Sequence, residues 1–245
     1  MPSIPVDVLR EILGHVRRAD LATLCRVNKI FCSCSQNVLY RRIHKPGKRV
    51  ILTLAQSTDL ARRVRSFAIH CKRPGLATAL QNMSSLRHLD LDCIDDASIL
   101  DGCTFKLDSF TGSFFCPESF QKFLDSQPSL TEITIYDDCE PMDPFSERCL
   151  PHLTRVNAEP SRLAVLVPGQ PVREVTVFSS LNFDSTDWSF FTLSTTPIQK
   201  LCIHDDMLYP KPGSLMASVF PSLVHLVVYA YDVEWAVRAP LCLSI

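Results

Sequence analysis

Residues 128–135 read Pro-Ser-Leu-Thr-Glu-Ile-Thr-Ile, with apolar side chains at the first, fourth and sixth positions counted from Leu130. Apolar residues two apart in a short run predict a β-strand with one buried face. The same spacing occurs at eight places along the chain, so it decides the fold. The eight triplets are Val64/Phe67/Ile69, Leu86/Leu89/Leu91, Leu107/Phe110/Gly112, Leu130/Ile133/Ile135, Leu153/Val156/Ala158, Val172/Val175/Val177, Ile198/Leu201/Ile203 and Leu223/Leu226/Val228.

The spacing between triplets is nearly regular. Successive first positions lie 22, 21, 23, 23, 19, 26 and 25 residues apart. Leucine-rich repeats have a period of roughly 20–29 residues, although no asparagine follows these triplets at a regular position. A single repeat cannot bury its own apolar face, so the repeats must stack. We therefore predict an α/β fold in which residues 64–245 form a short leucine-rich-repeat solenoid of about eight repeats, with a parallel curved sheet and helices or loops on its convex side.

The residues before the first triplet have helical periodicity instead. Apolar residues recur at three, four and seven residues between Val8 and Val16, which predicts an amphipathic helix. Asp20 is suited to begin a second helix, and a third helix should end before Pro46-Gly47. Three short helices bury too little surface to be stable alone. Their apolar face must therefore pack either on the rest of the chain or on another protein.

Four segments of this region resemble one family. They are Ile4-Pro5-Val6-Asp7-Val8-Leu9-Arg10-Glu11-Ile12-Leu13, then Ala19-Asp20-Leu21, then Cys25-Arg26-Val27-Asn28-Lys29-Ile30-Phe31, then Leu39-Tyr40-Arg41-Arg42-Ile43. Together they resemble an F-box, which implies an F-box at residues 1–45 that docks on the Skp adaptor and through it on a cullin scaffold. The resemblance implies adaptor contacts by Ile4, Pro5, Val8, Leu9, Ile12, Leu21 and Leu24. Residues 46–63 would be a linker or a first packing helix.

Charge divides the chain into two parts. Residues 1–87 contain 16 Lys and Arg and 4 acidic residues, a net charge of +12, whereas residues 88–245 have a net charge of −13. Such a split predicts two modules with different partners. The basic run at residues 41–49 could contact nucleic acid, but it has no interleaved aromatic residues. We interpret it as a solvated linker and consider nucleic acid an unlikely partner.

Aligning the triplets places other residues in columns on the opposite, concave face of the sheet. The third-position column alternates in sign at Glu132, Arg155, Glu174 and Lys200. Neighbouring strands would bring these side chains within pairing distance, which makes them either a surface charge ladder or a binding surface. The seventh-position column adds further candidates for binding a protein target, namely Tyr136, Phe178, His204 and Tyr229.

Three Asp-Asp pairs follow predicted strands, at residues 95–96, 137–138 and 205–206. On one rim of the sheet they would favour a basic partner, although helix caps and solvated loops are equally compatible with them.

The sequence contains none of the motifs that we associate with catalysis. It has no His-Glu-x-x-His, Gly-x-Ser-x-Gly or phosphate-binding loop, and Cys32-x-Cys34 lacks a second pair of metal ligands. We therefore expect no enzyme activity, no cofactor and no metal. The 11 cysteines are odd in number and no secretory signal precedes them, so we expect a cytoplasmic or nuclear protein with reduced thiols and no membrane span.

These features lead to one hypothesis and two alternatives. The chain is expected to be the substrate-recognition subunit of a cullin-based SCF-type ubiquitin ligase, with the F-box on the adaptor and the repeats on a protein target. The first alternative is a leucine-rich-repeat scaffold without a ligase role. The second is a weak nucleic-acid binder that uses the basic N-terminal segment.

Overall fold

The computed structural model describes residues 4–91, 97–112, 117–136, 150–178, 188–204 and 219–229. The chain divides into two compact units. The first comprises Met1–Asp92 with Ile99–Lys106, and the second comprises Cys93–Ser98 with Leu107–Ile245.

The first unit begins with three helices, α1 (Val6–Gly14), α2 (Arg18–Leu24) and α3 (Lys29–Arg41). Asn28 caps α3, because its side-chain oxygen accepts a hydrogen bond of 3.0 Å from the Phe31 backbone N–H. The expected N-cap at Asp20 is wrong by three residues, since the N-cap of α2 is Arg17 and the helix begins at Arg18. Asp20 lies in the first turn of α2 and pairs with Arg17 at 3.0 Å.

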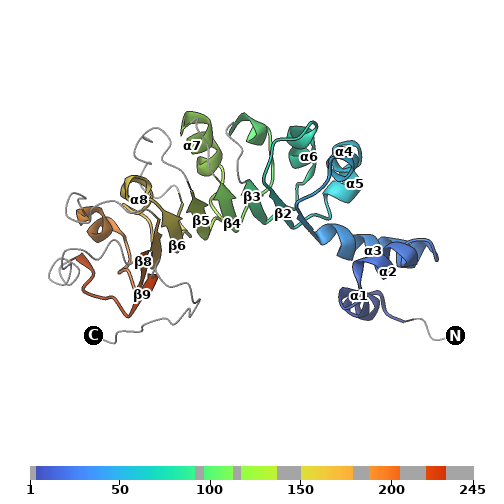
Figure 1. Cartoon of the computed structure of the whole chain (residues 1–245), viewed down its shortest axis with the longest axis horizontal. Coiled ribbons are helices and arrows are strands. Elements are labelled where there is room, and N and C mark those ends of the chain that lie inside the picture. Colours follow the sequence, from blue (N-terminus) through green and yellow to red (C-terminus); the bar gives the residue numbers. More distant parts are fainter. Residues whose placement is uncertain are drawn as a thin grey trace, which may run out of the picture. The chain divides into compact units, whose positions relative to one another are not determined.

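The rest of the first unit alternates strands with helices. Strands β1, β2 and β3 are parallel and lie in chain order, and the helices lie on one face of them (Figure 1). The elements are β1 (Arg42–His44), α4 (Lys48–Gln56), α5 (Thr58–Ala61), β2 (Ser66–Ile69), α6 (Leu76–Asn82) and β3 (His88–Leu91), followed in the chain by the 3-10 helix η1 (Ala97–Leu100).

The second unit repeats this pattern with six described strands. Each strand from β4 to β9 is parallel to its neighbours in the chain, and α7 and α8 lie on one face of the strands (Figure 1). The elements are β4 (Ser109–Gly112), α7 (Pro117–Asp125), β5 (Glu132–Ile135), β6 (Arg155–Ala158), α8 (Pro160–Leu166), β7 (Glu174–Val177), the 3-10 helix η3 (Ser189–Leu193), β8 (Lys200–His204) and β9 (His225–Tyr229).

The predicted triplets form the core of both units. Their fourth-position side chains from β2 to β8 are between 0 and 2 % exposed, and the last one, Leu226, is 9 % exposed. Strand register also follows the predicted columns, since Glu132 pairs with Arg155 and Arg155 pairs with Glu174. The expected fold class is confirmed: N-terminal helices are followed by parallel strands in the arrangement of a repeat solenoid.

Buried amides link neighbouring repeats, which the sequence did not lead us to expect. The Gln127 side-chain oxygen accepts a bond of 2.9 Å from the Leu107 N–H, and Gln170 accepts one of 3.1 Å from Leu150. Asn82 makes the opposite kind of link, because its side-chain N–H donates to the carbonyl of Ala55 at 2.9 Å. A buried backbone group without a hydrogen-bond partner is costly. These side chains supply such partners between repeats, which is the role of the asparagine ladder in leucine-rich repeats.

The basic run at residues 41–49 is not a linker, which corrects our interpretation of it. Arg42–His44 form β1, which pairs with β2, and α4 begins at Lys48. The strand escaped the triplet search because Lys45 stands at its sixth position, where the other repeats have an apolar residue. Lys45 adopts a left-handed conformation with φ of 49° and ends the strand. Within residues 46–63 the structure has two helices, α4 (Lys48–Gln56) and α5 (Thr58–Ala61).

Candidate functional site

The three N-terminal helices fold around a small apolar core of their own. Leu9 and Leu13 lie on one side of α1 and pack with Leu21 and Cys34. Residues four apart share a helix face, so this spacing directs one side of α1 inward. The helices therefore have a folded interior that does not depend on their remaining apolar side chains.

Those remaining side chains are exposed. Of the ten large apolar side chains that the described residues expose, six lie between residues 4 and 30. Val8 and Ile12, one turn apart on α1, are 49 % and 51 % exposed. We call these six side chains the apolar surface: Ile4, Val6, Val8, Ile12, Val27 and Ile30. So many exposed apolar side chains within one short stretch of the chain are typical of a protein-binding region.

The structure divides the seven expected adaptor residues into two groups. Ile4, Pro5, Val8 and Ile12 are exposed, and Leu24 is half-buried. Leu9 and Leu21 are only 7 % and 1 % exposed, so they support the folded helices instead of presenting side chains to a partner. Adaptor contact by the exposed residues stays a prediction.

The periodicity did not identify Val27 and Ile30 as exposed. α2 ends at Leu24, which leaves Val27 in the turn that follows. Ile30 is in the first turn of α3, one residue before the half-buried Phe31. The sequence did contain a signal for Ile30. Asn28 is a typical helix-capping residue, and it places Ile30 in the first turn of a helix, where fewer neighbouring residues are available to pack against its side chain.

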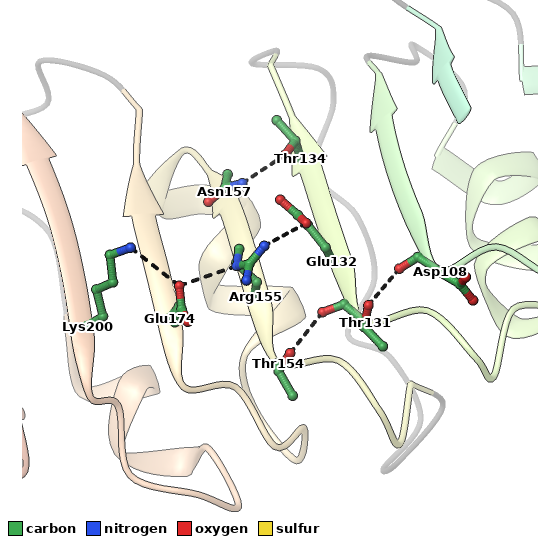
Figure 2. Close-up of polar contacts among 9 residues, drawn as sticks. All are labelled: Asp108, Thr131, Glu132, Thr134, Thr154, Arg155, Asn157, Glu174 and Lys200. Carbon is green, nitrogen blue, oxygen red and sulfur yellow. Dashed lines mark hydrogen bonds and ion pairs between the residues drawn. The ribbon is translucent and has the colours of Figure 1, made fainter. Parts of the chain in front are cut away.

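A second candidate surface lies on the face of β5 to β8 opposite the helices. The Arg155 guanidinium contacts Glu132 at 2.8 Å and Glu174 at 3.3 Å, and Lys200 reaches Glu174 at 3.5 Å (Figure 2). Strand register brings these four side chains together, because each occupies the same position in its repeat. We call Glu132, Arg155, Glu174 and Lys200 the charge ladder.

The charge ladder is accessible to a partner. Its side chains are between 34 % and 46 % exposed. A hollow of about 410 Å³ opens beside it, lined by Arg155, Asn157, Glu174, Thr176, Lys200 and Cys202, with the backbone neighbour Val175. Asn157 also donates to Thr134 across the strands at 2.9 Å (Figure 2). Exposed ion pairs contribute roughly 0–1 kcal/mol to stability, so the ladder offers alternating charges that a partner can use without unfolding the sheet.

Two of the three expected aromatic side chains come together at the ends of the strands. The rings of Tyr136 and Phe178 stack with centroids 5.5 Å apart and planes inclined by 21°. They follow β5 and β7, so they lean toward each other across the end of β6. Tyr136 is 50 % exposed and Phe178 is half-buried, which leaves one aromatic face for contact with a partner.

Two further target-binding residues were expected, His204 and Tyr229. His204 and Tyr229 are register partners at the ends of β8 and β9, but their side chains lie outside the described part of the chain. The three Asp-Asp pairs at residues 95–96, 137–138 and 205–206 also lie outside the described residues.

Two thiols, those of Cys25 and Cys103, have a pKa that is raised above the ordinary value. Burial raises the pKa of Cys25, and the neighbouring Cys32 thiol adds to the effect. Burial also raises the pKa of Cys103 to about 12, with a smaller contribution from the Asp101 carboxylate. A raised pKa lowers the thiolate fraction at neutral pH, which is the opposite of what a nucleophilic cysteine requires.

The described ranges contain neither a candidate metal centre nor a candidate membrane span. No group of three or more His, Cys, Asp or Glu side chains in these ranges is placed to hold a metal ion. No described helix has the length and apolar character needed to span a bilayer.

Comparison with known proteins identifies the N-terminal helices. Residues 1–42 match the F-box domain family, which coincides with α1, α2 and α3. None of the curated proteins compared with the chain matches it. An F-box domain indicates an adaptor-binding role in SCF-type ubiquitin ligases, and proteins with this domain are generally non-enzymatic receptors. The chain therefore carries an F-box domain at residues 1–42, followed by parallel strands in the arrangement of a repeat solenoid.

Proposed function

We propose that the chain is the substrate-recognition subunit of a cullin-based SCF-type ubiquitin ligase. The F-box domain binds the Skp adaptor through the apolar surface, and the charge ladder with Tyr136 and Phe178 holds a protein target. A separate enzyme transfers ubiquitin, and this chain contributes by raising the effective concentration of the target near that enzyme. The chain itself performs no bond chemistry in this proposal, and it acts in the cytoplasm or nucleus.

The observation that carries the proposal is the exposure of Val8 and Ile12 on a helix whose other side is fully packed. Leu9 and Leu13 already complete the interior of the F-box domain, at 7 % and 2 % exposed. Val8 and Ile12 therefore contribute nothing comparable to folding while they remain in water. Burial of such side chains against a partner stabilises a complex by about 25 cal/mol per Å² of apolar area removed from water, before the cost of association is subtracted.

The second half of the proposal concerns the target. Alternating charges at the start of β5 and β7, with the exposed Tyr136 and half-buried Phe178 after the same strands, can make both ion pairs and apolar contacts, the combination found at many protein interfaces. The three Asp-Asp pairs of the sequence favour a target with basic character. The repeats are therefore proposed to recognise a folded protein surface or segment with basic and apolar residues.

Affinity capture from cells tests the two halves separately. Wild type should recover the Skp adaptor, a cullin and a set of targets. Val8→Asp/Ile12→Asp should lose adaptor and cullin but retain targets, because a buried unpaired charge is disfavoured at the interface. Tyr136→Ala/Lys200→Ala should lose targets but retain adaptor and cullin. Failure of wild type to recover adaptor contradicts the ligase role, and retention of every target by the second variant contradicts the assigned target surface.

A further inference from the structure

An open groove of about 900 Å³ in the first unit is lined mainly by cationic side chains. It lies among α1, α3, β1 and residues 62–65. Its lining includes seven arginines and two carboxylates, those of Asp7 and Glu11. The arginines are Arg10, Arg18, Arg41, Arg42, Arg62, Arg63 and Arg65. We call this the arginine groove.

Four of these arginines are held in place by contacts within the unit. Arg18 donates to the Arg42 carbonyl at 2.6 Å, Arg63 to the Ser33 carbonyl at 2.9 Å, and Arg65 to the Ser85 carbonyl at 2.8 Å. A carbonyl orients a guanidinium without neutralising its charge. Among the described residues, Arg10 is the one arginine of the seven that has a carboxylate partner, Asp7 at 3.3 Å. The bonds therefore position three cations and leave their charge available.

The guanidinium groups of Arg41, Arg42 and Arg62 have no hydrogen-bond or ion-pair partner within the described residues, and all three side chains are exposed. Arg41 and Arg65 immediately precede the paired strands β1 and β2, and the Arg65 N–H donates to the Arg41 carbonyl at 2.9 Å. An excess of like charge in one small region is unfavourable, and a bound anion would reduce it.

The lining also distinguishes between kinds of anion. No Phe, Tyr or Trp side chain is among the residues that line the groove, so it lacks the usual stacking platform of single-strand binding proteins. Asp7 and Glu11 would repel a uniformly charged phosphate backbone, whereas a polypeptide can place neutral residues beside them. Val16 and Val38 provide apolar contacts for such residues, and guanidinium groups in fixed orientations bind carboxylates or phosphates in a bidentate manner.

We propose that the arginine groove binds an anionic segment of a partner polypeptide, with its carboxylate or phosphate groups on Arg41, Arg42 and Arg62. This is a surface distinct from the apolar surface of α1. Arg10 and Gly14 of the groove are offset by two residues from Val8 and Ile12, which corresponds to about 200° around a helix. The inference therefore does not depend on adaptor binding.

Fluorescence anisotropy with the full chain and defined labelled probes tests the proposal. The probes are a glutamate-rich peptide, a phosphoserine peptide of equal charge, a glutamine peptide of equal length, and a single-stranded oligonucleotide of equal charge. One or both anionic peptides should bind, the glutamine peptide should not, and affinity should fall as salt rises. The stronger of the two anionic peptides identifies carboxylate or phosphate as the preferred group.

Matched variants distinguish binding in the arginine groove from non-specific attraction of an anionic peptide to the basic N-terminal region. Arg41→Gln/Arg62→Gln should weaken peptide binding about tenfold or more, because it removes two charge-assisted contacts from exposed side chains that the fold does not use. Arg26→Gln/Arg49→Gln removes two exposed charges outside the groove and should have little effect. Equal losses in both variants, absence of anionic-peptide binding at low salt, or tighter binding of the oligonucleotide would overturn the proposal. The assay contains no adaptor, so such a failure leaves the proposed ligase role untouched.

Discussion

At the scale of single residues, Arg155 connects the charge ladder because its guanidinium contacts carboxylates on both neighbouring strands. The contacts are 2.8 Å to Glu132 and 3.3 Å to Glu174, and all three side chains are at least one-third exposed. Water and salt screen such pairs, so their net contribution to folding is small. An arginine that bridges two carboxylates at little benefit to the fold is well suited to exchange them for groups on a partner.

Arg155→Ala should therefore lower the free energy of unfolding by less than about 1 kcal/mol. Urea denaturation followed by circular dichroism measures this, with Arg173→Ala as the control because Arg173 is exposed, immediately precedes β7 and makes no ion pair among the described residues. A loss above about 2 kcal/mol relative to the control would show that the ladder is structural.

Cys103 should be far less reactive than an ordinary thiol. Burial and Asp101 raise its pKa from 9.0 to about 12, which lowers its thiolate fraction near pH 8 by about a thousandfold. Iodoacetamide labelling of the native chain, with peptides mapped by mass spectrometry, should modify the exposed Cys71 well before Cys103. In urea the difference should disappear; equal labelling rates in the native chain would contradict the assigned burial.

At the scale of elements, the strands could be predicted from sequence because each repeat follows the same rule. Apolar residues at positions four and six have to face inward. Aligning the triplets therefore also predicted which residues of neighbouring strands pair with each other. Strand β1 was missed because Lys45 breaks the rule at position six. The buried amides were missed because Gln127 and Gln170 stand at different distances before their triplets, three and two residues, and polar residues there resemble an ordinary loop.

The amide links make a prediction at this scale. Gln127→Ala should lower the free energy of unfolding by about 1–3 kcal/mol, because the buried Leu107 N–H loses its partner. Gln199→Ala is a matched control, since Gln199 is exposed and immediately precedes β8. Chemical denaturation of both variants checks this, and equal stabilities would show that the Gln127 side chain does not support the repeats.

At the scale of the whole chain, the F-box helices are attached to the strands that follow them within the first unit. Arg18 donates to the Arg42 carbonyl, and Arg63 donates to the Ser33 carbonyl in α3. Sequence reasoning separated residues 1–45 from the repeats because helical and strand periodicity meet there. It could identify which α1 residues are apolar, but separating the exposed Val8 from the buried Leu9 required the packing of α1 against α2 and α3.

Deleting residues 1–45 should therefore destabilise the first unit, whatever the function of the helices. The deletion removes β1 and its bonds to β2, and exposes the edge of β2 to water. A lower thermal midpoint than wild type is expected by circular dichroism, whereas Val8→Asp/Ile12→Asp should leave the midpoint within a few degrees. An unchanged thermal midpoint after the deletion would contradict the connection between the F-box helices and the strands of the first unit. Because the deletion affects folding as well as binding, Val8→Asp/Ile12→Asp is the better variant for separating a scaffold role from a ligase role.

The most direct test is titration calorimetry of the purified chain with a purified Skp adaptor. The account predicts a one-to-one complex for wild type and no measurable heat for Val8→Asp/Ile12→Asp, whose circular dichroism spectrum should match that of wild type. Absence of binding by wild type, or equal affinity for the folded variant, would contradict the claim that the exposed apolar side chains of α1 form the docking surface.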